Sequence, residues 1–397
     1  MSYLFHFLLR TKLIQLSLLG LGLVLMGFQL SNLVDSGILN QDDFVEYWAA
    51  GRLNLSGANP YDPQWLFALQ VEVWPDRKEP LMMWNPPWAL ALVMPFGFLD
   101  YTSARLLWLA GSLILVFLSI NWIWEMYGGT DRKRWLGWSF GLAFMPTLLV
   151  LRTGQISLLL LAGLLGFLLA VRSERYLLAG VAVSLLMVKP HLLLIFWLAL
   201  AVWVLRQRRY QVLFGCAIPL TFGSLLALAF NPVVFQHYAA SASTQPPTIW
   251  VTATIGALLR LLLGPAQIWY QFIPLALGAI WFIWYWLINH QGWSWGGQMP
   301  AIVLVSLLSS PFGWSFDQVV LLLVIIPITV WVTAQNDRKH TRVFALAYFL
   351  IQAMALVINL LDLNHIWFVW VPPAFAVMYI LYASRQAKVQ LVSRQQS

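Results

Sequence analysis

Apolar runs long enough to form membrane helices recur along the whole chain, and they constrain its fold more than any other feature. Only 10% of the 397 residues are charged, whereas a soluble domain carries about 25%. The chain cannot cover its apolar surface and needs lipid as solvent. About twelve runs are predicted to span: 13–30, 104–124, 136–151, 156–171, 176–188, 192–205, 212–230, 266–288, 299–313, 316–333, 343–360 and 367–383. We therefore expect an all-α polytopic membrane protein that forms a single module, 1–397.

Basic residues indicate how these helices are oriented. If the N-terminus is cytoplasmic and each run crosses once, 16 of the 23 Lys and Arg residues fall on the cytoplasmic side, as the positive-inside rule requires. Counting the short run 88–99 as a crossing would move Arg132–Arg134 outside, so we expect 88–99 to lie in the membrane interface. We read 13–30 as a retained first span rather than a signal peptide. Both termini are then cytoplasmic, in what we expect to be a bacterial plasma membrane.

Two long loops then lie outside, at about 31–103 and 231–265. Nine of the 15 carboxylates fall in the first loop, which is also expected to carry interfacial helices. Asp43 precedes the helix-like stretch 44–55. Asp43 is either the N-cap of that helix, where Asp satisfies free N–H groups, or a functional carboxylate.

Short neighbouring spans predict a polar cavity on the external side. The runs between 136 and 205 are only 13 to 16 residues long, and 13 residues rise about 20 Å, less than the roughly 30 Å hydrocarbon core. Their outer turns hold Arg152 and Gln155, then Lys189 and His191. Two cations there suit a phosphate group; the alternative is that they reach toward lipid headgroups. Asp317 begins a later span and is either functional or a helix cap.

Several kinds of site are not indicated. The single cysteine, Cys216, lies in an apolar run, and no His or carboxylate spacing indicates a metal, so no metal or other cofactor is expected. The basic residues fit membrane orientation rather than nucleic acid. No Gly-rich phosphate loop follows a strand, so a transferase of this kind needs its donor delivered in lipid.

Five segments in fixed order carry a family resemblance. They are "DFVEYWAAGRLNLSGANPYDP" (43–63), "WNPPWALALVMPFGFL" (84–99), "TGQISLLLL" (153–161), "LAGVAVSLLMVKPHLLL" (178–194) and "SSPFGWSFDQVV" (309–320). Together they resemble glycosyltransferase family 87, the polyprenyl-phosphate-mannose-dependent mannosyltransferase type with the GT-C membrane fold. Two places depart from the family pattern. Asn85 stands where the family has an aromatic residue, and Phe316, Asp317 or Gln318 stands where a His often follows the late Trp.

The resemblance implies an inverting transfer on the external face. A hexose, in this family most often mannose, would pass from a polyprenyl-phosphate donor to a glycolipid or glycan acceptor. It implies Asp43 as the base, with Asp42 as the alternative, and Glu46 as a residue that orients the acceptor. Arg152 and Lys189 would hold the donor phosphate. Further sugar and acceptor contacts are expected from Tyr47, Trp84, Asn85, Gln155, His191 and Asp317.

Two other classes of function stay open from sequence alone. A transporter or flippase of lipid-linked sugars would also have short or broken spans, but it would form no glycosidic bond. The long acidic first loop and the lack of an evident internal repeat argue against a transporter. A structural assembly partner would show neither activity.

Overall fold

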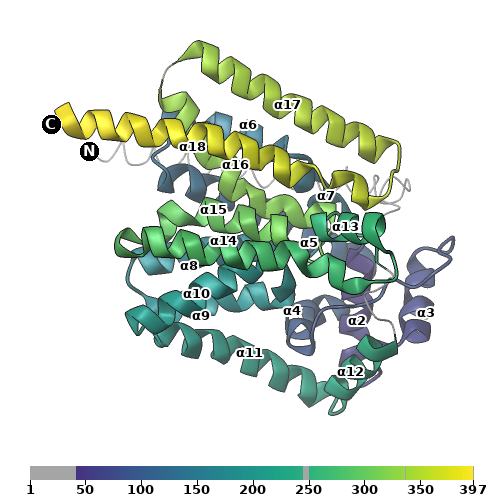
Figure 1. The fold of residues 1–397 in the computed structure, drawn as a ribbon. Coiled ribbons are helices and arrows are strands. Elements are labelled where there is room, and N and C mark those ends of the chain that lie inside the picture. Colours follow the sequence, from purple (N-terminus) through teal and green to yellow (C-terminus); the bar gives the residue numbers. More distant parts are fainter. Residues whose placement is uncertain (1–41, 245–249, 336, 397) are drawn as a thin grey trace, which may run out of the picture.

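Helices joined by turns make up the part of the chain that the computed structural model describes, residues 42–244, 250–335 and 337–396 (Figure 1). The α-helices are α2 Phe44–Leu55, α3 Pro63–Val73, α4 Pro87–Gly97, α5 Tyr101–Met126, α6 Arg134–Leu142, α7 Met145–Thr153, α8 Leu158–Arg172, α9 Tyr176–Ser184, α10 Leu194–Gln207, α11 Gln211–Phe230, α12 Val234–Thr244, α13 Ile255–Leu263, α14 Ile273–Asn289, α15 Trp295–Ser309, α16 Leu322–Ala334, α17 Arg338–Leu360 and α18 Val371–Gln396. Short 3-10 helices extend or join them: η1 Asp131–Lys133, η2 Leu185–Val188, η3 Pro190–Leu193, η5 Ile268–Phe272, η6 His290–Gly292, η7 Ser315–Leu321 and η8 His365–Phe368. No strand occurs in the described ranges, so the all-α prediction is confirmed.

Many of these helices have the length and composition of membrane spans. Among the described residues seven segments qualify, or eight if the bent pair Asp131–Leu142 and Met145–Thr153 forms one span. The seven are Tyr101–Met126, Pro190–Gln207, Gln211–Phe230, Ile268–Gly292, Ser315–Ala334, Arg338–Leu360 and His365–Ser384. Shorter apolar helices accompany them: Pro87–Gly97, Leu158–Arg172, Tyr176–Val188 and Trp295–Ser309. The multi-pass architecture is confirmed. The total of about twelve crossings stays a prediction, and its first run, 13–30, lies outside the described residues.

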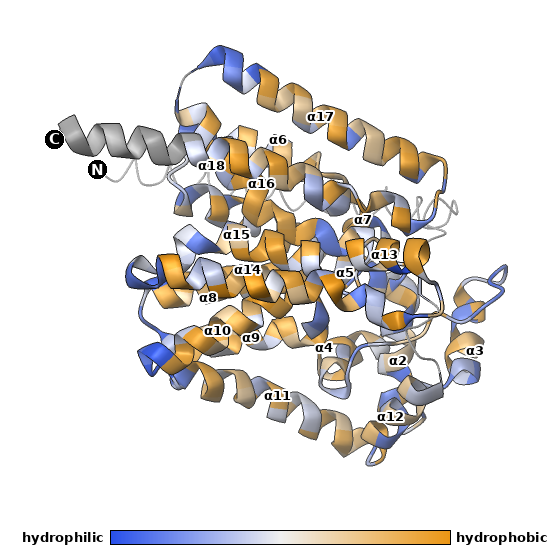
Figure 2. Cartoon of the chain, viewed as in Figure 1, coloured by the Kyte–Doolittle hydropathy of each residue, from blue (hydrophilic) through white to orange (hydrophobic). Residues whose placement is uncertain are grey.

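Helix α16 forms the centre of the bundle. Every residue from 321 to 330 is buried, and α5, α6, α15 and α18 pack around it. The outer helices α11, α14 and α17 instead expose large apolar side chains, among them Phe214, Ile280 and Leu346. Orange, the colour of hydrophobic residues, covers much of these helices in Figure 2. Helices that are apolar on their outer face as well as their inner face are stable in a membrane but not in water. The exposed faces of these three helices are therefore assigned to lipid.

The helices α2 and α4 of the first predicted loop are held against the bundle by close backbone contacts. A Cβ atom added to Gly97 would lie 2.6 Å from the Arg52 nitrogen, so α2 and α4 touch backbone to backbone. On its other side α4 meets α11, where a Cβ on Gly223 would lie 2.8 Å from the Trp88 carbonyl oxygen. The run 88–99 is thus a packed helix of 11 residues, too short for the roughly 20 needed to cross. Its place in the interface stays a prediction.

One stretch predicted as a simple span is interrupted, and one predicted turn is present as a break between helices. The run 136–151 is two helices, because α6 ends at Leu142 and α7 leaves at an angle of 63°. Pro146 in the first turn of α7 has no N–H for a helix continuing from α6. Farther along, the helix that begins at α9 stops at Lys189, which is held out of the helical region by the proline that follows. The C-terminal turn of α7 and the break at Lys189 both reach the cavity described next.

Candidate active site

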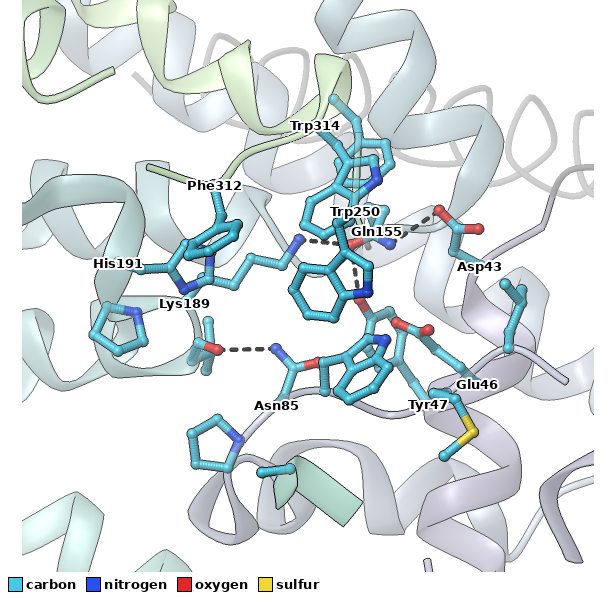
Figure 3. A pocket seen from close by; sticks show the side chains of 18 of the residues that line it. Asp43, Glu46, Tyr47, Asn85, Gln155, Lys189, His191, Trp250, Phe312 and Trp314 are labelled. Carbon is cyan, nitrogen blue, oxygen red and sulfur yellow. Dashed lines mark hydrogen bonds between the residues drawn. The ribbon is translucent and has the colours of Figure 1, made fainter. Parts of the chain in front are cut away.

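A cavity of about 550 Å³ opens where α2, the α7–α8 turn and the break at Lys189 meet (Figure 3). Its wall comes from loops that the charge pattern placed on one side of the membrane, so the structure brings those loops together at one end of the bundle. The predicted site residues that line it are Asp43, Glu46, Tyr47, Trp84, Asn85, Gln155, Lys189 and His191. Asp42, Arg152 and Asp317 do not line it.

The backbone fixes Asp43 beside the α7–α8 turn. Its N–H donates to the Thr153 carbonyl oxygen at 2.8 Å. Gly154 follows with φ +69°, a left-handed conformation that ends α7 and favours glycine. A Cβ on Gly154 would lie 2.6 Å from the Cβ of Phe44. Only glycine allows the turn to come this close to the start of α2.

The two neighbouring aspartates have separate roles, and of the two readings of Asp43 left open by the sequence the N-cap is not the one its side chain adopts. The Asp43 side chain makes no capping hydrogen bond. Instead Asp42 Oδ1 accepts from the Phe44 N–H at 2.9 Å, while Asp43 Oδ2 accepts from Gln155 Nε2 at 2.9 Å. The capping oxygen comes from one residue earlier because Asp43 already has helical backbone angles. The Asp43 carboxylate is therefore free of the helix end and lies in the cavity wall.

Asp42 belongs to a buried ion pair outside the cavity. Its Oδ2 lies 2.9 Å from Arg105 Nε, and both side chains are 1% exposed. The Tyr101 hydroxyl donates to the same oxygen. Arg105 also donates to the carbonyl oxygens of Leu151 and Arg152, at 3.0 and 2.8 Å. Asp42 thus ties α2, α5 and the end of α7 together.

Burial changes the acidity of the carboxyl groups in the cavity wall, which lie in the first loop and not in a predicted span. It raises the pKa of Asp43 to about 6, while the hydrogen bond from Gln155 acts in the opposite direction. Burial, with the nearby charge of Asp43, raises the pKa of Glu46 well above its usual value. Both pKa shifts favour the protonated form, and for Glu46 the charge of Asp43 adds to the effect of burial.

Lys189 lies at the centre of a polar network behind the cavity wall. Its ammonium group donates to Gln155 Oε1 at 2.9 Å, to Ser157 Oγ at 3.2 Å and to Asp317 Oδ1 at 2.8 Å. Asp317 accepts further from Ser157 Oγ at 2.5 Å and from the Trp314 N–H at 2.8 Å. This last bond is part of a capping box at the start of η7, so Asp317 serves the helix start as a residue three positions after the cap. It is also the buried counter-ion of Lys189.

Arg152 is directed elsewhere. Its Nη1 donates to Asn359 Oδ1 of α17 at 3.0 Å, and it does not line the cavity. The two cations expected to hold one phosphate are therefore not brought together. Lys189 is the one Lys or Arg in the cavity wall among the described residues.

Aromatic side chains form much of the remaining wall. Trp84 packs edge-on against Trp250, with ring centroids 4.8 Å apart, and Asn85 Nδ2 donates to the Val188 carbonyl oxygen at 2.9 Å. Some lining residues were not chosen from the sequence: Tyr238, Trp250, Phe312, Trp314 and His365. Four of them lie in loops predicted on the same side, and Phe312 lies at the outer end of the predicted run 299–313, so that shared side was the available signal. His365 Nδ1 lies 2.9 Å from Ser315 Oγ.

Metal-binding groups do not gather in the described part of the chain, where no cluster of three or more His, Cys, Asp or Glu side chains could hold an ion. The wall of the cavity combines one acidic group near pKa 6, one buried cation and several aromatic rings. Such a wall can accept a proton from a hydroxyl and pack against the faces of a sugar.

Fold and cavity together define a multi-pass membrane protein with a polar site at one end of its helices. The model of glycosyltransferase family 87 matches residues 84–359, more than two thirds of the chain. The chain belongs to this family and is a membrane glycosyltransferase, as the motifs predicted; this membership counts against the transporter reading. The matched range begins at Trp84, after Asp43. Neither the curated proteins nor the solved structures contain a match.

Proposed function

We propose that the enzyme transfers a hexose, with inversion, from a polyprenyl-phosphate donor to a glycolipid or glycan hydroxyl, with Asp43 as the base. The observation that carries this proposal is the Asp43 carboxylate. It lies in the cavity wall, its pKa is raised to about 6, and Gln155 holds one of its oxygens. A base with a pKa near the working pH combines the ionised form with a strong drive to take the proton.

The proposed step needs a single carboxylate. The acceptor O–H proton passes to Asp43 as the acceptor oxygen forms a bond to the anomeric carbon of the donor sugar. The bond from that carbon to the phosphate oxygen breaks, its electron pair stays on the phosphate, and the polyprenyl phosphate leaves. Attack from the face opposite the phosphate inverts the anomeric centre. One displacement of this kind needs no covalent sugar–enzyme intermediate.

The cavity wall supports a donor with a charged head and an apolar remainder. Lys189 is the Lys or Arg side chain that lines the described cavity wall, and contact with the donor phosphate would require it to exchange one of its bonds to Gln155, Ser157 or Asp317. Trp84, Trp250 and Trp314 offer apolar faces to sugar rings. We place the site on the external face of a bacterial plasma membrane, from the charge pattern of the loops.

A transfer assay with the purified full chain in nanodiscs tests the reaction. A short-chain polyprenyl-phosphate mannose serves as donor, with extracted membrane glycolipids as acceptors, and NMR of the product reports the anomeric configuration. We expect a new glycosidic bond with the configuration opposite to that of the donor. Retained configuration contradicts the single displacement. Transfer from a nucleotide sugar but not from the lipid donor contradicts the proposed donor class.

A further inference from the structure

Gln155 joins three polar groups of the cavity through one amide. Its Oε1 accepts from the Tyr47 hydroxyl at 2.7 Å and from Lys189 Nζ at 2.9 Å, while its Nε2 donates to Asp43 Oδ2 at 2.9 Å (Figure 3). Building on the proposed function, we propose that Gln155 is a positioning residue for the base: it holds one oxygen of Asp43 and leaves the other free for the acceptor hydroxyl.

The chemistry of its partners fixes which way the amide of Gln155 faces. An ammonium group only donates and an ionised carboxylate only accepts. Lys189 therefore requires the amide oxygen, and Asp43 requires the amide nitrogen. Turning the amide over would place two donors together and two acceptors together. The orientation follows from these charges, without reference to hydrogen positions.

Lys189 is itself held in place, which makes the amide rigid. An ammonium group has three N–H donors, and here they meet Gln155, Ser157 and Asp317. Asp317 is 1% exposed and Lys189 8% exposed, so water does not compete freely for these bonds. The chain of contacts runs from the start of η7 through Lys189 and Gln155 to the base.

Asp43 has a partly open carboxylate at the end of this chain. Oδ2 is held by Gln155, whereas Oδ1 has no hydrogen-bond partner among the described residues. The Asp43 backbone is tied to Thr153, two positions before Gln155, at 2.8 Å. The side chain and the backbone of the base are thus both hydrogen-bonded to the end of α7 and the turn that follows it. One oxygen remains for the acceptor.

The groups around Asp43 determine whether loss of the Gln155 hydrogen bond raises or lowers the pKa of Asp43. Asp42 opposes its ionisation, Lys189 and Arg77 favour it, and the Gln155 hydrogen bond favours it more strongly than either of these positive charges. Removing the amide donor must therefore raise the pKa of Asp43. One hydrogen bond to a charged group corresponds to a shift of about one pH unit or more.

Infrared titration of the full chain in nanodiscs measures this shift without a substrate. We expect a protonated-carboxyl band that Asp43→Asn removes and that titrates near pH 6 in the unaltered chain. In Gln155→Leu the same band should titrate about one pH unit or more higher. Gln155→Glu keeps an acceptor for Tyr47 and Lys189 but loses the donor, so it should also raise the midpoint even if the leucine variant folds poorly.

Gln352→Leu is the matched control, because it removes a buried amide that accepts from the Met145 N–H at 2.8 Å but does not line the cavity. Its Asp43 band should titrate as in the unaltered chain. An unchanged midpoint in both Gln155 variants overturns the inference, as does the absence of a band that depends on Asp43. Failure of the proposed function is separate: Asp43→Asn would then keep its transfer activity, whatever the titration shows.

Discussion

Asp42 and Asp43 are adjacent in sequence, but Asp42 has a structural role and Asp43 has the proposed chemical role. Asp42 faces Arg105 in a contact that excludes water, and it supplies the helix cap. Asp43 faces the cavity. Composition and spacing treat the two carboxylates alike. Their difference comes from the packing of α5 and α7 against the start of α2, which leaves room for an ion pair on one side only.

For Asp43→Asn we expect transfer to fall about 10²- to 10⁴-fold, the usual contribution of a general base, because an amide cannot take the acceptor's proton. Stability should change little. The side chain makes no cap bond, and the asparagine oxygen can still accept from Gln155. Turnover and the melting temperature, measured on the same preparation, check both parts. Full transfer activity in this variant would exclude Asp43 as the base.

For Asp42→Asn the expected defect is in folding. The substitution leaves the buried Arg105 charge without its counter-ion, and breaking a buried pair in this way costs about 3–5 kcal/mol. A lower melting temperature and reduced yield of folded protein are the expected results, with folded molecules still active. The companion variant Arg105→Met with Asp42→Asn removes both charges and should recover part of the loss. A stable but inactive Asp42→Asn protein would instead point to Asp42 as the base.

Among the elements, the α7–α8 turn has the largest influence on the site. It provides the carbonyl that holds the Asp43 backbone and the amide that holds its side chain. It reaches α2 only because Gly154 has no Cβ and tolerates a left-handed backbone. The bend between α6 and α7 directs this turn toward the cavity, which a straight span over 136–151 would not do.

Gly154→Ala tests this dependence. The added Cβ would lie 2.6 Å from the Phe44 Cβ at φ +69°, so the turn must move away from Asp43. We expect a loss of stability of about 1–3 kcal/mol and a loss of transfer activity. Chemical denaturation and the transfer assay measure the two effects.

Gly128→Ala is the control, because Gly128 has φ +83° but nothing within 4 Å of an added Cβ. It should show only the smaller cost of backbone strain and keep its activity. Equal behaviour of the two variants would mean that the close approach of the turn to α2 does not matter for the site.

At the scale of the whole molecule, the loops that were predicted on one side of the membrane meet at one cavity. Segments far apart in sequence, around residues 43, 155, 189, 250, 314 and 365, line one cavity. The basic turn at Asp131–Lys133 belongs to a different cavity region, where Lys133 lies with Arg338 and Arg342. Grouping of this kind is what a bundle with a consistent inside and outside produces.

Cysteine labelling in intact cells tests which loops are external and which are cytoplasmic. In a Cys216→Ser background, Asp131→Cys and Ser243→Cys each place one thiol on an exposed position. An impermeant maleimide should label position 243 from outside and position 131 only after the membrane is opened. The reverse pattern would mean either an inverted topology or a crossing by 88–99, and labelling of both from outside would contradict the five crossings predicted between the two positions.

Fold class and helix positions follow from local properties. Apolar runs of sufficient length form helices in lipid wherever they occur, because every backbone group must find its partner within the segment. From 104 onward each predicted run is helical in the structure, although 136–151 is divided into two helices and the loop predicted at 231–265 contains α12 and α13. The family motifs could also be identified directly in the sequence. The side shared by the site loops also followed from counting charges.

Contacts between segments distant in sequence decided which polar side chains enter the site and which do not. The cap belongs to Asp42 because α5 supplies Arg105 to the same carboxylate, and Arg152 leaves the site because α17 presents Asn359. Asp317 is a counter-ion rather than a lining residue because Lys189 and Ser157 surround it. Trp250 and His365 join the wall only when their loops fold over it. In these contacts the direction of a polar side chain depends on partners that are 63 to 207 residues away, and no local pattern in the chain encodes those contacts.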